Sequence, residues 1–275
     1  MGDTWSPLFY QCSPLFNVIS STAAHFSTYN DWPGLEDYNH LLLSTQGILT
    51  SQSDLPLKFV PQGDKPKTLQ QQYEARIYLS GEIQTRLNNW HDFFQVMVWC
   101  NYKNTKAIIN KIHYQALSER YSSDENSGKR SDTENCLTLF DECGAIIVSS
   151  NPALLQLIKD YDWLNLFLSN RQCFDHSIKC FIFGHALFEK GLNPYLGMTA
   201  HCICLQVDDD FFALDLNRQT EIVDQLSSEY FKRRSDLSPR ELNPLPLLGV
   251  PGWDNRNTNP SFYQNKDYFR PARIK

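Results

Sequence analysis

The sequence lacks the short motifs that mark the commonest enzyme families. It has no G-x-G-x-x-G dinucleotide loop, no Walker phosphate loop, no G-x-S-x-G turn, no H-E-x-x-H helix and no C-x-x-C pair. Each of these motifs fixes a backbone cradle, a nucleophile or a pair of metal ligands at a set spacing. Their absence argues against the common nucleotide-binding proteins, serine hydrolases and zinc proteases.

Long hydrophobic runs are also missing. The most apolar stretch, Phe93 to Cys100, is eight residues long and contains Gln95, whereas a membrane span needs about 20 apolar residues. The chain does not begin with a basic segment followed by an apolar one, so no secretory signal is predicted. A loose Met-Gly-x-x-x-Ser pattern for N-myristoylation is present, but Asp3 directly after Gly2 is a poor context for it. We therefore expect no membrane partner.

The cysteine pattern gives no sign of a disulfide or zinc framework. The eight cysteines are scattered without paired spacing. Cys202 and Cys204 alternate with Ile203 in a strand-like run, so both point to the same face. Most of the others have apolar neighbours, where a free thiol behaves as a small hydrophobic side chain. This usage predicts a reducing compartment and a cytoplasmic location.

Acidic residues outnumber basic ones, which gives a formal net charge of −6. Nucleic-acid binding depends largely on Lys and Arg that neutralise phosphates, so the charge argues against a nucleic-acid partner and leaves a small-molecule ligand open. Hydrophobic residues make up 41% of the chain and aromatic residues 13%, enough for a sizeable core in 275 residues. We expect one globular unit, with an irregular N-terminal arm (1–54) packed on a main domain (55–275).

Helical periodicity is clearest after residue 88. One apolar stripe, capped by Asn89, is formed by Trp90, Phe93, Phe94, Met97 and Val98. Similar patterns predict helices near residues 35–43, 105–120, 132–143, from 152, from 184 and 214–233. Apolar or alternating runs predict strands near residues 75–79, 145–148, 178–183 and 199–207. Gly144 is expected to cap a helix in the left-handed conformation. The predicted fold class is α+β, a mostly helical unit with a small sheet.

Two polar or irregular segments complete the prediction. Residues 121–131 are expected to form an exposed, mobile loop, because they hold no apolar anchor after Tyr121. Residues 242–275 contain five prolines and two glycines, yet also five aromatic rings. We expect these rings to hold an ordered, irregular C-terminal arm across the domain.

His185 and Glu189 lie four residues apart on the helix predicted from Gly184, and so share one face. The positive end of a helix disfavours a protonated imidazole. A neutral histidine beside a carboxylate suits a metal site or a general base. A buried hydrogen bond that only fixes this turn is the competing interpretation. His113, on the apolar face one turn after Ile109, is a further candidate metal ligand, although a hydrogen-bonded core histidine is the plainer interpretation.

Two other groups carry ionisable side chains at helix ends. His91 and Asp92 open the Trp90 helix, where Asp92 suits the first turn and a capping role competes with a catalytic one. Asp141 and Glu142 precede Gly144, at a helix end whose negative dipole disfavours carboxylates. A cation is expected to compensate this pair, either a basic side chain such as Arg130 or a metal ion.

Several short segments together resemble a bacterial family known as domain of unknown function 3025. They are Asn89-Trp-His-Asp-Phe93, Leu137-Thr-Leu-Phe-Asp-Glu-Cys-Gly-Ala145, Phe183-Gly-His-Ala-Leu-Phe-Glu-Lys190 with Pro194-Tyr195, Leu245-Pro-Leu-Leu-Gly-Val-Pro-Gly-Trp253 and Tyr268-Phe269-Arg270. The likeness spans roughly residues 55 to 275 and is specific in combination. It implies one uncharacterised bacterial domain and brings no known activity, so it assigns no residue a role.

Two functional hypotheses follow. The first is a small-molecule or nucleic-acid-processing enzyme whose polar site is built from His185, Glu189 and either His91, His113 or the Asp141–Glu142 pair, with a divalent metal cofactor and metal-assisted hydrolysis left open. Its catalytic candidates are His185, Glu189, His91, Asp141 and Glu142, and its candidate metal ligands are His185, Glu189 and His113. The second is a non-catalytic binding or scaffold protein in which these residues only cap helices and stabilise the fold. A working site requires the side chains to converge within about 4 Å in a concave pocket.

Overall fold

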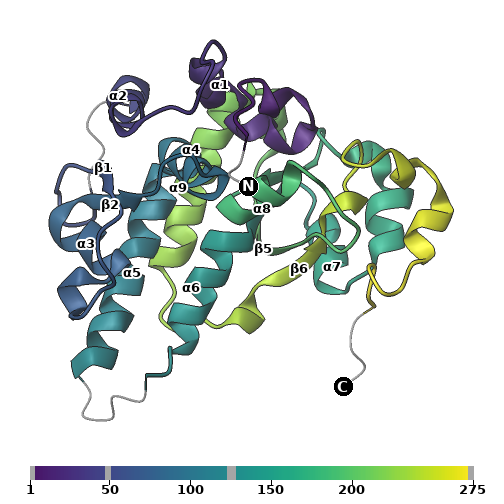
Figure 1. Ribbon diagram of the computed structural model, residues 1–275. Helices are drawn as coiled ribbons and strands as arrows, with labels where there is room; N and C mark the ends of the chain where they lie inside the picture. Colours follow the sequence, from purple (N-terminus) through teal and green to yellow (C-terminus); the bar gives the residue numbers. More distant parts are fainter. Residues whose placement is uncertain (1–3, 47–50, 123–127, 272–275) are drawn as a thin grey trace.

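The computed structural model describes residues 4–46, 51–122 and 128–271. Within them the chain forms one α+β unit, in which helices surround a small mixed sheet (Figure 1). Residues 123–127 of the predicted loop (121–131) lie outside these ranges. Gly2 of the myristoylation pattern also lies outside them. None of the described helices has the length and apolarity needed to cross a membrane.

The sheet has four strands in the order β4-β3-β5-β6. Its central strand, β3 (Gly144–Ser149), is buried along its whole length. It pairs antiparallel with β4 (Ile178–Ile182) and parallel with β5 (Thr199–Gln206). The edge strand β6 (Asn243–Pro246) runs antiparallel to β5. The apolar runs predicted as strands near residues 145, 178 and 199 are thus confirmed as the core of the sheet.

The helices follow the predicted caps and stripes in most places. Their bounds are α1 Ser20–Ala23, α2 Leu35–Gln46, α3 Tyr73–Ser80, α4 Trp90–Asn101, α5 Lys103–Ser122, α6 Asp132–Cys143, α7 Pro152–Lys159, α8 His185–Gly191 and α9 Leu216–Lys232. Asn89 caps α4 by accepting a hydrogen bond from the Asp92 amide at 3.0 Å. Helix α4 packs against α8 and α5, and α6 packs against α5 and α8. These contacts bring the ends of α4, α6 and α8 together.

The strand predicted near residues 75–79 is wrong, because this segment forms helix α3. Ala75 and Ile77 are both buried although they are two residues apart in the helix, so their alternation was mistaken for a strand. Gly81 ends the helix at a φ of 68°, and a Cβ there would lie 2.1 Å from the Pro56 carbonyl oxygen. The strands of this region are β1 (Lys58–Pro61) and β2 (Glu82–Thr85), which pair in parallel.

Gly144 does not form the predicted left-handed cap. Its φ of −79° and ψ of 148° are extended, so α6 passes directly into β3. A Cβ at this position would lie 2.2 Å from the Phe140 carbonyl oxygen. Close backbone packing, and not a positive φ, therefore requires glycine here.

Both ends of the chain pack on this unit through aromatic rings. At the N-terminus, Phe9 and Phe16 are buried, and Trp5 stacks on Trp90 of α4 with ring centroids 5.2 Å apart. At the C-terminus, residues 247–271 form short 3-10 helices and turns, as the irregular arm predicted. The Tyr268 hydroxyl is buried and donates a hydrogen bond to the Met198 carbonyl at 2.6 Å.

Candidate metal centre

Close backbone contacts of Gly144 and Gly184 hold the end of α6 beside the start of α8. The amides of Phe183 and Gly184 both donate to the Gly144 carbonyl, at 3.0 and 2.8 Å. A Cβ on Gly184 would lie 2.4 Å from the Glu142 carbonyl oxygen and 2.5 Å from the Gly144 nitrogen. Only glycine permits this approach, which sets the last turn of α6 beside His185, the first residue of α8.

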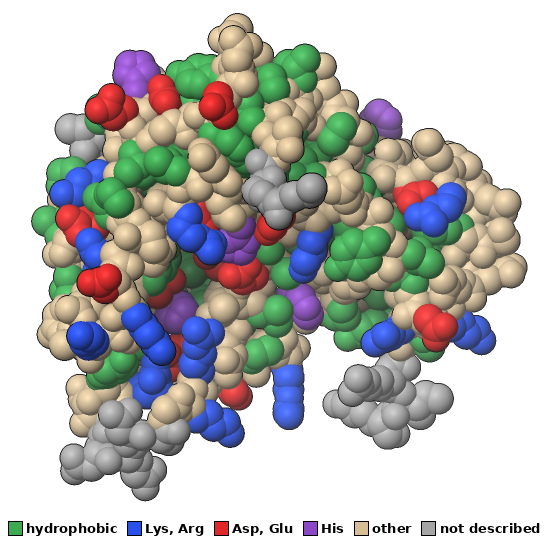
Figure 2. Space-filling view, in the orientation of Figure 1, with side chains coloured by type: hydrophobic (Ala, Val, Ile, Leu, Met, Phe, Trp, Pro, Cys, Tyr) green, Lys and Arg blue, Asp and Glu red, His purple; other side chains and the backbone are tan. Residues whose placement is uncertain are grey.

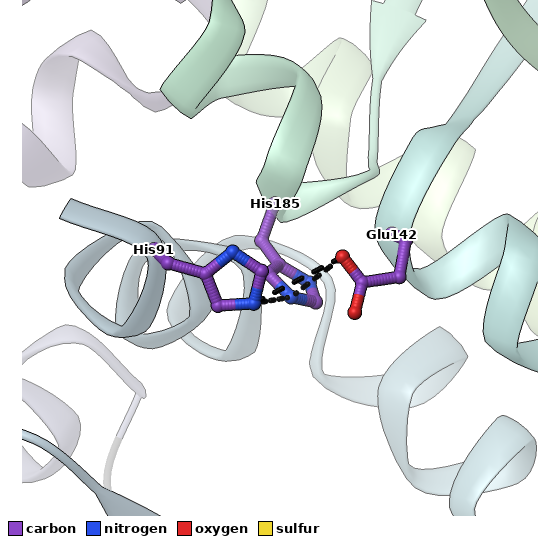
Figure 3. A group of neighbouring side chains, drawn as sticks. All are labelled: His91, Glu142 and His185. Atoms are coloured by element: carbon purple, nitrogen blue, oxygen red, sulfur yellow. Dashed lines mark hydrogen bonds and ion pairs between the residues drawn. The ribbon is translucent and has the colours of Figure 1, made fainter.

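Three side chains from three helices converge at this junction: His91 from α4, Glu142 from α6 and His185 from α8 (Figure 3). The Nε2 atoms of the two histidines are 2.9 Å apart. Glu142 Oε2 lies 3.5 Å from His185 Nε2 and 3.9 Å from His91 Nε2. The imidazole planes are nearly perpendicular, at 81°.

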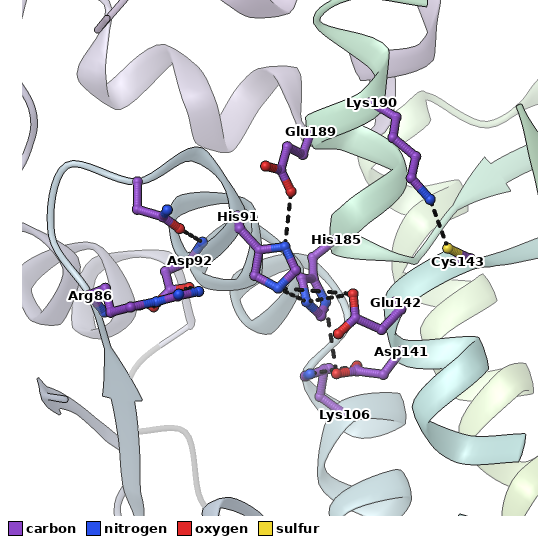
Figure 4. A network of polar contacts seen from close by, with 11 residues as sticks. Arg86, His91, Asp92, Lys106, Asp141, Glu142, Cys143, His185, Glu189 and Lys190 are labelled. Atoms are coloured by element: carbon purple, nitrogen blue, oxygen red, sulfur yellow. Dashed lines mark hydrogen bonds and ion pairs between the residues drawn. The ribbon is translucent and has the colours of Figure 1, made fainter. Parts of the chain in front are cut away.

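A second carboxylate lies on the far side of each imidazole (Figure 4). His91 Nδ1 is 2.9 Å from Glu189 Oε2, and His185 Nδ1 is 3.8 Å from Asp141 Oδ2. A carboxylate favours an N–H at the nitrogen that faces it, which favours a hydrogen at Nδ1 of His91, whereas His185 Nδ1 has no hydrogen-bond partner among the described residues. The contact between the two Nε2 atoms is a hydrogen bond when one of them carries a hydrogen; with both ring hydrogens at Nδ1, the two lone pairs would repel unless a cation lay between or beside them.

The burial of His185 determines its protonation state. The side chain is only 2% exposed, and burial lowers the pKa of His185 to about 4, although Asp141 opposes the change. The ring is therefore neutral near pH 7, as a metal ligand must be. Burial also raises the pKa of Glu142, with His91 acting in the opposite direction. A metal ion would favour the ionised form of this carboxylate.

Lys106 supplies the positive charge expected near the Asp141–Glu142 pair. It lies on α5, is 4% exposed, and its Nζ is 2.6 Å from Asp141 Oδ1. Burial would raise the pKa of Asp141, but Lys106 and His185 lower it below the ordinary value. Arg130, the basic residue named from the sequence, instead has its Nη1 3.5 Å from Thr138 Oγ1. Lys106 was missed, although it sits between Thr105 and Ala107 on a buried stretch of its helix.

The three converging side chains border a cavity of about 300 Å³ with a polar lining. Acidic, basic and histidine side chains gather on this face of the molecule (Figure 2). His113 borders the same cavity, but its Nδ1 lies 3.7 Å from Glu74 Oε1. The structure therefore places His113 outside the His91–Glu142–His185 group, and it places Glu189 behind His91 instead of facing His185.

The five catalytic candidates inferred from the sequence thus lie in one network: His91, Asp141, Glu142, His185 and Glu189. Asp92 lies in the first turn of α4, as expected, and also forms an ion pair with Arg86, a residue that the sequence patterns did not single out. Asn89 provides the cap.

Comparisons with known proteins agree with the resemblance seen in the sequence. The family model described as "Protein of unknown function (DUF3025)" matches residues 57–273. This range contains every residue of the network, whereas the N-terminal arm precedes it. No curated protein and no solved structure shows significant similarity to the chain.

Proposed function

We propose that the chain, which belongs to the DUF3025 family, binds one divalent metal ion through His91, Glu142 and His185 and catalyses hydrolysis of a small polar molecule in the adjoining cavity. Zinc is the ion that this ligand set suits best. Imidazole nitrogens and one carboxylate form the ligand set of many catalytic zinc sites, which leave a fourth position open.

The separation of the three ligand atoms carries this proposal. A triangle with sides of 2.9, 3.5 and 3.9 Å has a point about 2.0 Å from all three corners. Zinc binds histidine nitrogen at about 2.0–2.1 Å and carboxylate oxygen at about 2.0–2.2 Å. One ion can therefore reach the three atoms without a change in the backbone.

The surrounding carboxylates support the same conclusion. Metal-binding histidines commonly donate the second ring N–H to a carboxylate, which fixes the tautomer and raises the basicity of the ligand nitrogen. Glu189 occupies this position for His91. Asp141 is the carboxylate nearest to His185 Nδ1, at 3.8 Å, which is beyond hydrogen-bond distance. Lys106 in turn holds Asp141.

The residues of the site can then be assigned roles. His91, His185 and Glu142 hold the ion, which would supply a Lewis acid and a bound water of lowered pKa. Glu189 orients the His91 imidazole, and the Asp141 carboxylate faces the His185 imidazole as a nearby negative charge. The cavity, at about 300 Å³, has the size of a small-ligand site, and its polar lining favours a substrate with several hydrogen-bonding groups.

Zinc titration of the chelator-treated protein, followed by calorimetry and elemental analysis, tests the assignment. We expect one equivalent to bind. His91→Ala, His185→Ala and Glu142→Gln should each weaken binding by more than about 100-fold, because removal of even an outer-shell group commonly costs about 10-fold to 100-fold.

His113→Ala is the matched control, because His113 borders the same cavity outside the three-ligand group. Its zinc affinity should stay within about threefold of the unchanged protein. Unchanged zinc affinity in all four variants would show that the ion binds elsewhere, and an equal loss in His113→Ala would make His113 a ligand as well. Absence of zinc, cobalt and manganese binding would overturn the metal centre and favour the non-catalytic interpretation.

A further inference from the structure

Arg86 is held in a fixed position beside the candidate metal centre. It directly follows β2, and its main-chain amide donates to Asp92 Oδ2 at 2.6 Å. Its guanidinium Nη2 donates to Asp92 Oδ1 at 2.7 Å, and Nε lies 3.2 Å from both carboxylate oxygens. Asp92 adjoins His91 in α4, so the same helical turn positions the guanidinium and a candidate metal ligand.

The remaining edge of this guanidinium is open. The Arg86 side chain is 54% exposed, while that of Asp92 is 7% exposed. In the described parts of the chain, Arg86 Nη1 has no hydrogen-bond partner. Arg86 borders the same cavity as His91, Glu142 and His185. In Figure 4 its side chain extends from β2 toward His91 along Asp92.

The charges around the cavity determine whether an anion can bind at the open edge of Arg86. Three arginines border the cavity against five carboxylates, and buried Lys106 neutralises Asp141. With Glu142 ionised, the side chains around the metal-free cavity carry one more negative than positive charge, which disfavours anions. A divalent cation at the three-ligand site removes this excess, so that a guanidinium with free donors becomes an attractive anion contact.

We propose that the substrate carries an oxyanion, either a carboxylate or a phosphate, which lies between the bound ion and the free Nη1 edge of Arg86. This inference rests on the proposed metal site, and it adds a specificity-determining residue and a substrate class. Asp92 acts as the positioning residue that keeps the guanidinium flat against α4. Anion and metal binding are then linked, so each strengthens the other by the same factor.

Binding of inorganic phosphate and of acetate to the zinc-loaded and zinc-free protein tests the proposal. We expect at least one of the two anions to bind the zinc-loaded form at least about 10-fold more tightly than the zinc-free form. The relative affinity of the two probes identifies the type of oxyanion. Arg86→Gln should reduce anion affinity by about 10-fold to 100-fold, because a hydrogen bond to a charged group is lost.

Arg86→Gln leaves Asp92 buried without its partner, so the double variant Arg86→Gln/Asp92→Asn provides a neutral pair for the same measurement. Arg218→Gln is the control, since Arg218 forms an exposed pair with Glu221. Loss of anion binding with retained zinc binding in the double variant supports the proposal. Unchanged anion binding in that variant, or equal anion binding without zinc, overturns it while the metal site stands. Failure of zinc to bind overturns both.

Discussion

Two buried polar clusters in this protein differ in how their hydrogen-bonding groups are matched. Asp224 of α9 lies at the start of α5, where donors surround a single carboxylate. At the His91–Glu142–His185 site, acceptors face one another. Both clusters join helices that are distant in the sequence, but only the second one has unmatched groups pointing to a common place.

The Asp224 cluster is saturated. One carboxylate oxygen accepts from the main-chain and side-chain nitrogens of Asn104, at 3.0 and 2.8 Å. The other accepts from the main-chain nitrogen and the hydroxyl of Thr105, both at 2.8 Å. Helix α5 follows α4 with only Tyr102 between them. Asp224 therefore satisfies the free amides at the start of α5 in place of a local cap.

The metal-site cluster lacks this match. Two imidazole Nε2 atoms and a carboxylate oxygen converge, and each of them is an acceptor when both ring hydrogens are at Nδ1 and Glu142 is ionised. A saturated cluster can stabilise the fold by itself, whereas a cluster of acceptors would be relieved by a cation. The comparison therefore predicts that Asp224 is a structural carboxylate and that Glu142 is a functional one.

The largest expected effect is the loss of stability on substitution of Asp224, the carboxylate of the saturated cluster. In Asp224→Asn, the new amide nitrogen would face the donors of Asn104 or Thr105, so buried N–H groups would lose their acceptor. We expect the free energy of unfolding to fall by about 3 kcal/mol, measured by urea denaturation of the zinc-free protein. Zinc affinity of the folded variant should be unchanged. A loss below about 0.5 kcal/mol would show that the cluster is not structural.

The next effect concerns the groups behind the ligands. Glu189→Gln keeps the size of the side chain but removes the charge that faces His91 Nδ1. Outer-shell changes of this kind weaken metal binding by about 10-fold to 100-fold, and we expect the lower end because the Glu189 side chain is 41% exposed. Glu221→Gln, an exposed glutamate paired with Arg218, is the control. Equal zinc affinities in the two variants would remove Glu189 from the site.

Local sequence patterns predicted most of the fold and drew attention to the five catalytic candidates that the structure brings into one network, but they did not predict the partners of these residues. The Trp90 stripe and its Asn89 cap identified α4 because both signals are contained within a few consecutive residues. The segment at residues 75–79 was assigned wrongly, because its buried residues Ala75 and Ile77 alternate as they would in a strand, although tertiary packing buries them in a helix.

The candidate site likewise contains residues that local sequence patterns identify and residues that only tertiary contacts bring in. His185 and Glu189 stand at helical spacing, and Asp141 and Glu142 stand at an unfavourable helix end, so these residues drew attention on local grounds. Lys106 and Arg86 became part of the site only through contacts between α5 and α6 and between β2 and α4. Which histidine completes the site is likewise a tertiary property, and the structure brings His91 to His185 and leaves His113 beside Glu74.

The smallest expected effect gives the sharpest test of the comparison. Replacing the carboxylate by an amide should lower the stability of the protein at Asp224 and raise the stability of the zinc-free protein at Glu142. Glu142→Gln makes the same change as Asp224→Asn, a carboxylate to an amide of nearly equal size. In the zinc-free protein, Glu142 is an acceptor among acceptors, and both burial and Asp141 raise its pKa. An amide N–H can donate to a lone pair of His91 or His185, so the substitution relieves the mismatch.

We expect the zinc-free variant to be more stable than the unchanged protein by about 0.5–1 kcal/mol in urea denaturation, the usual gain when a functional group is replaced. Saturating zinc should reverse the order, because only the unchanged protein gains binding free energy from the ion. If Glu142→Gln destabilises the zinc-free protein as Asp224→Asn does, Glu142 is a structural carboxylate and the distinction between the two clusters fails.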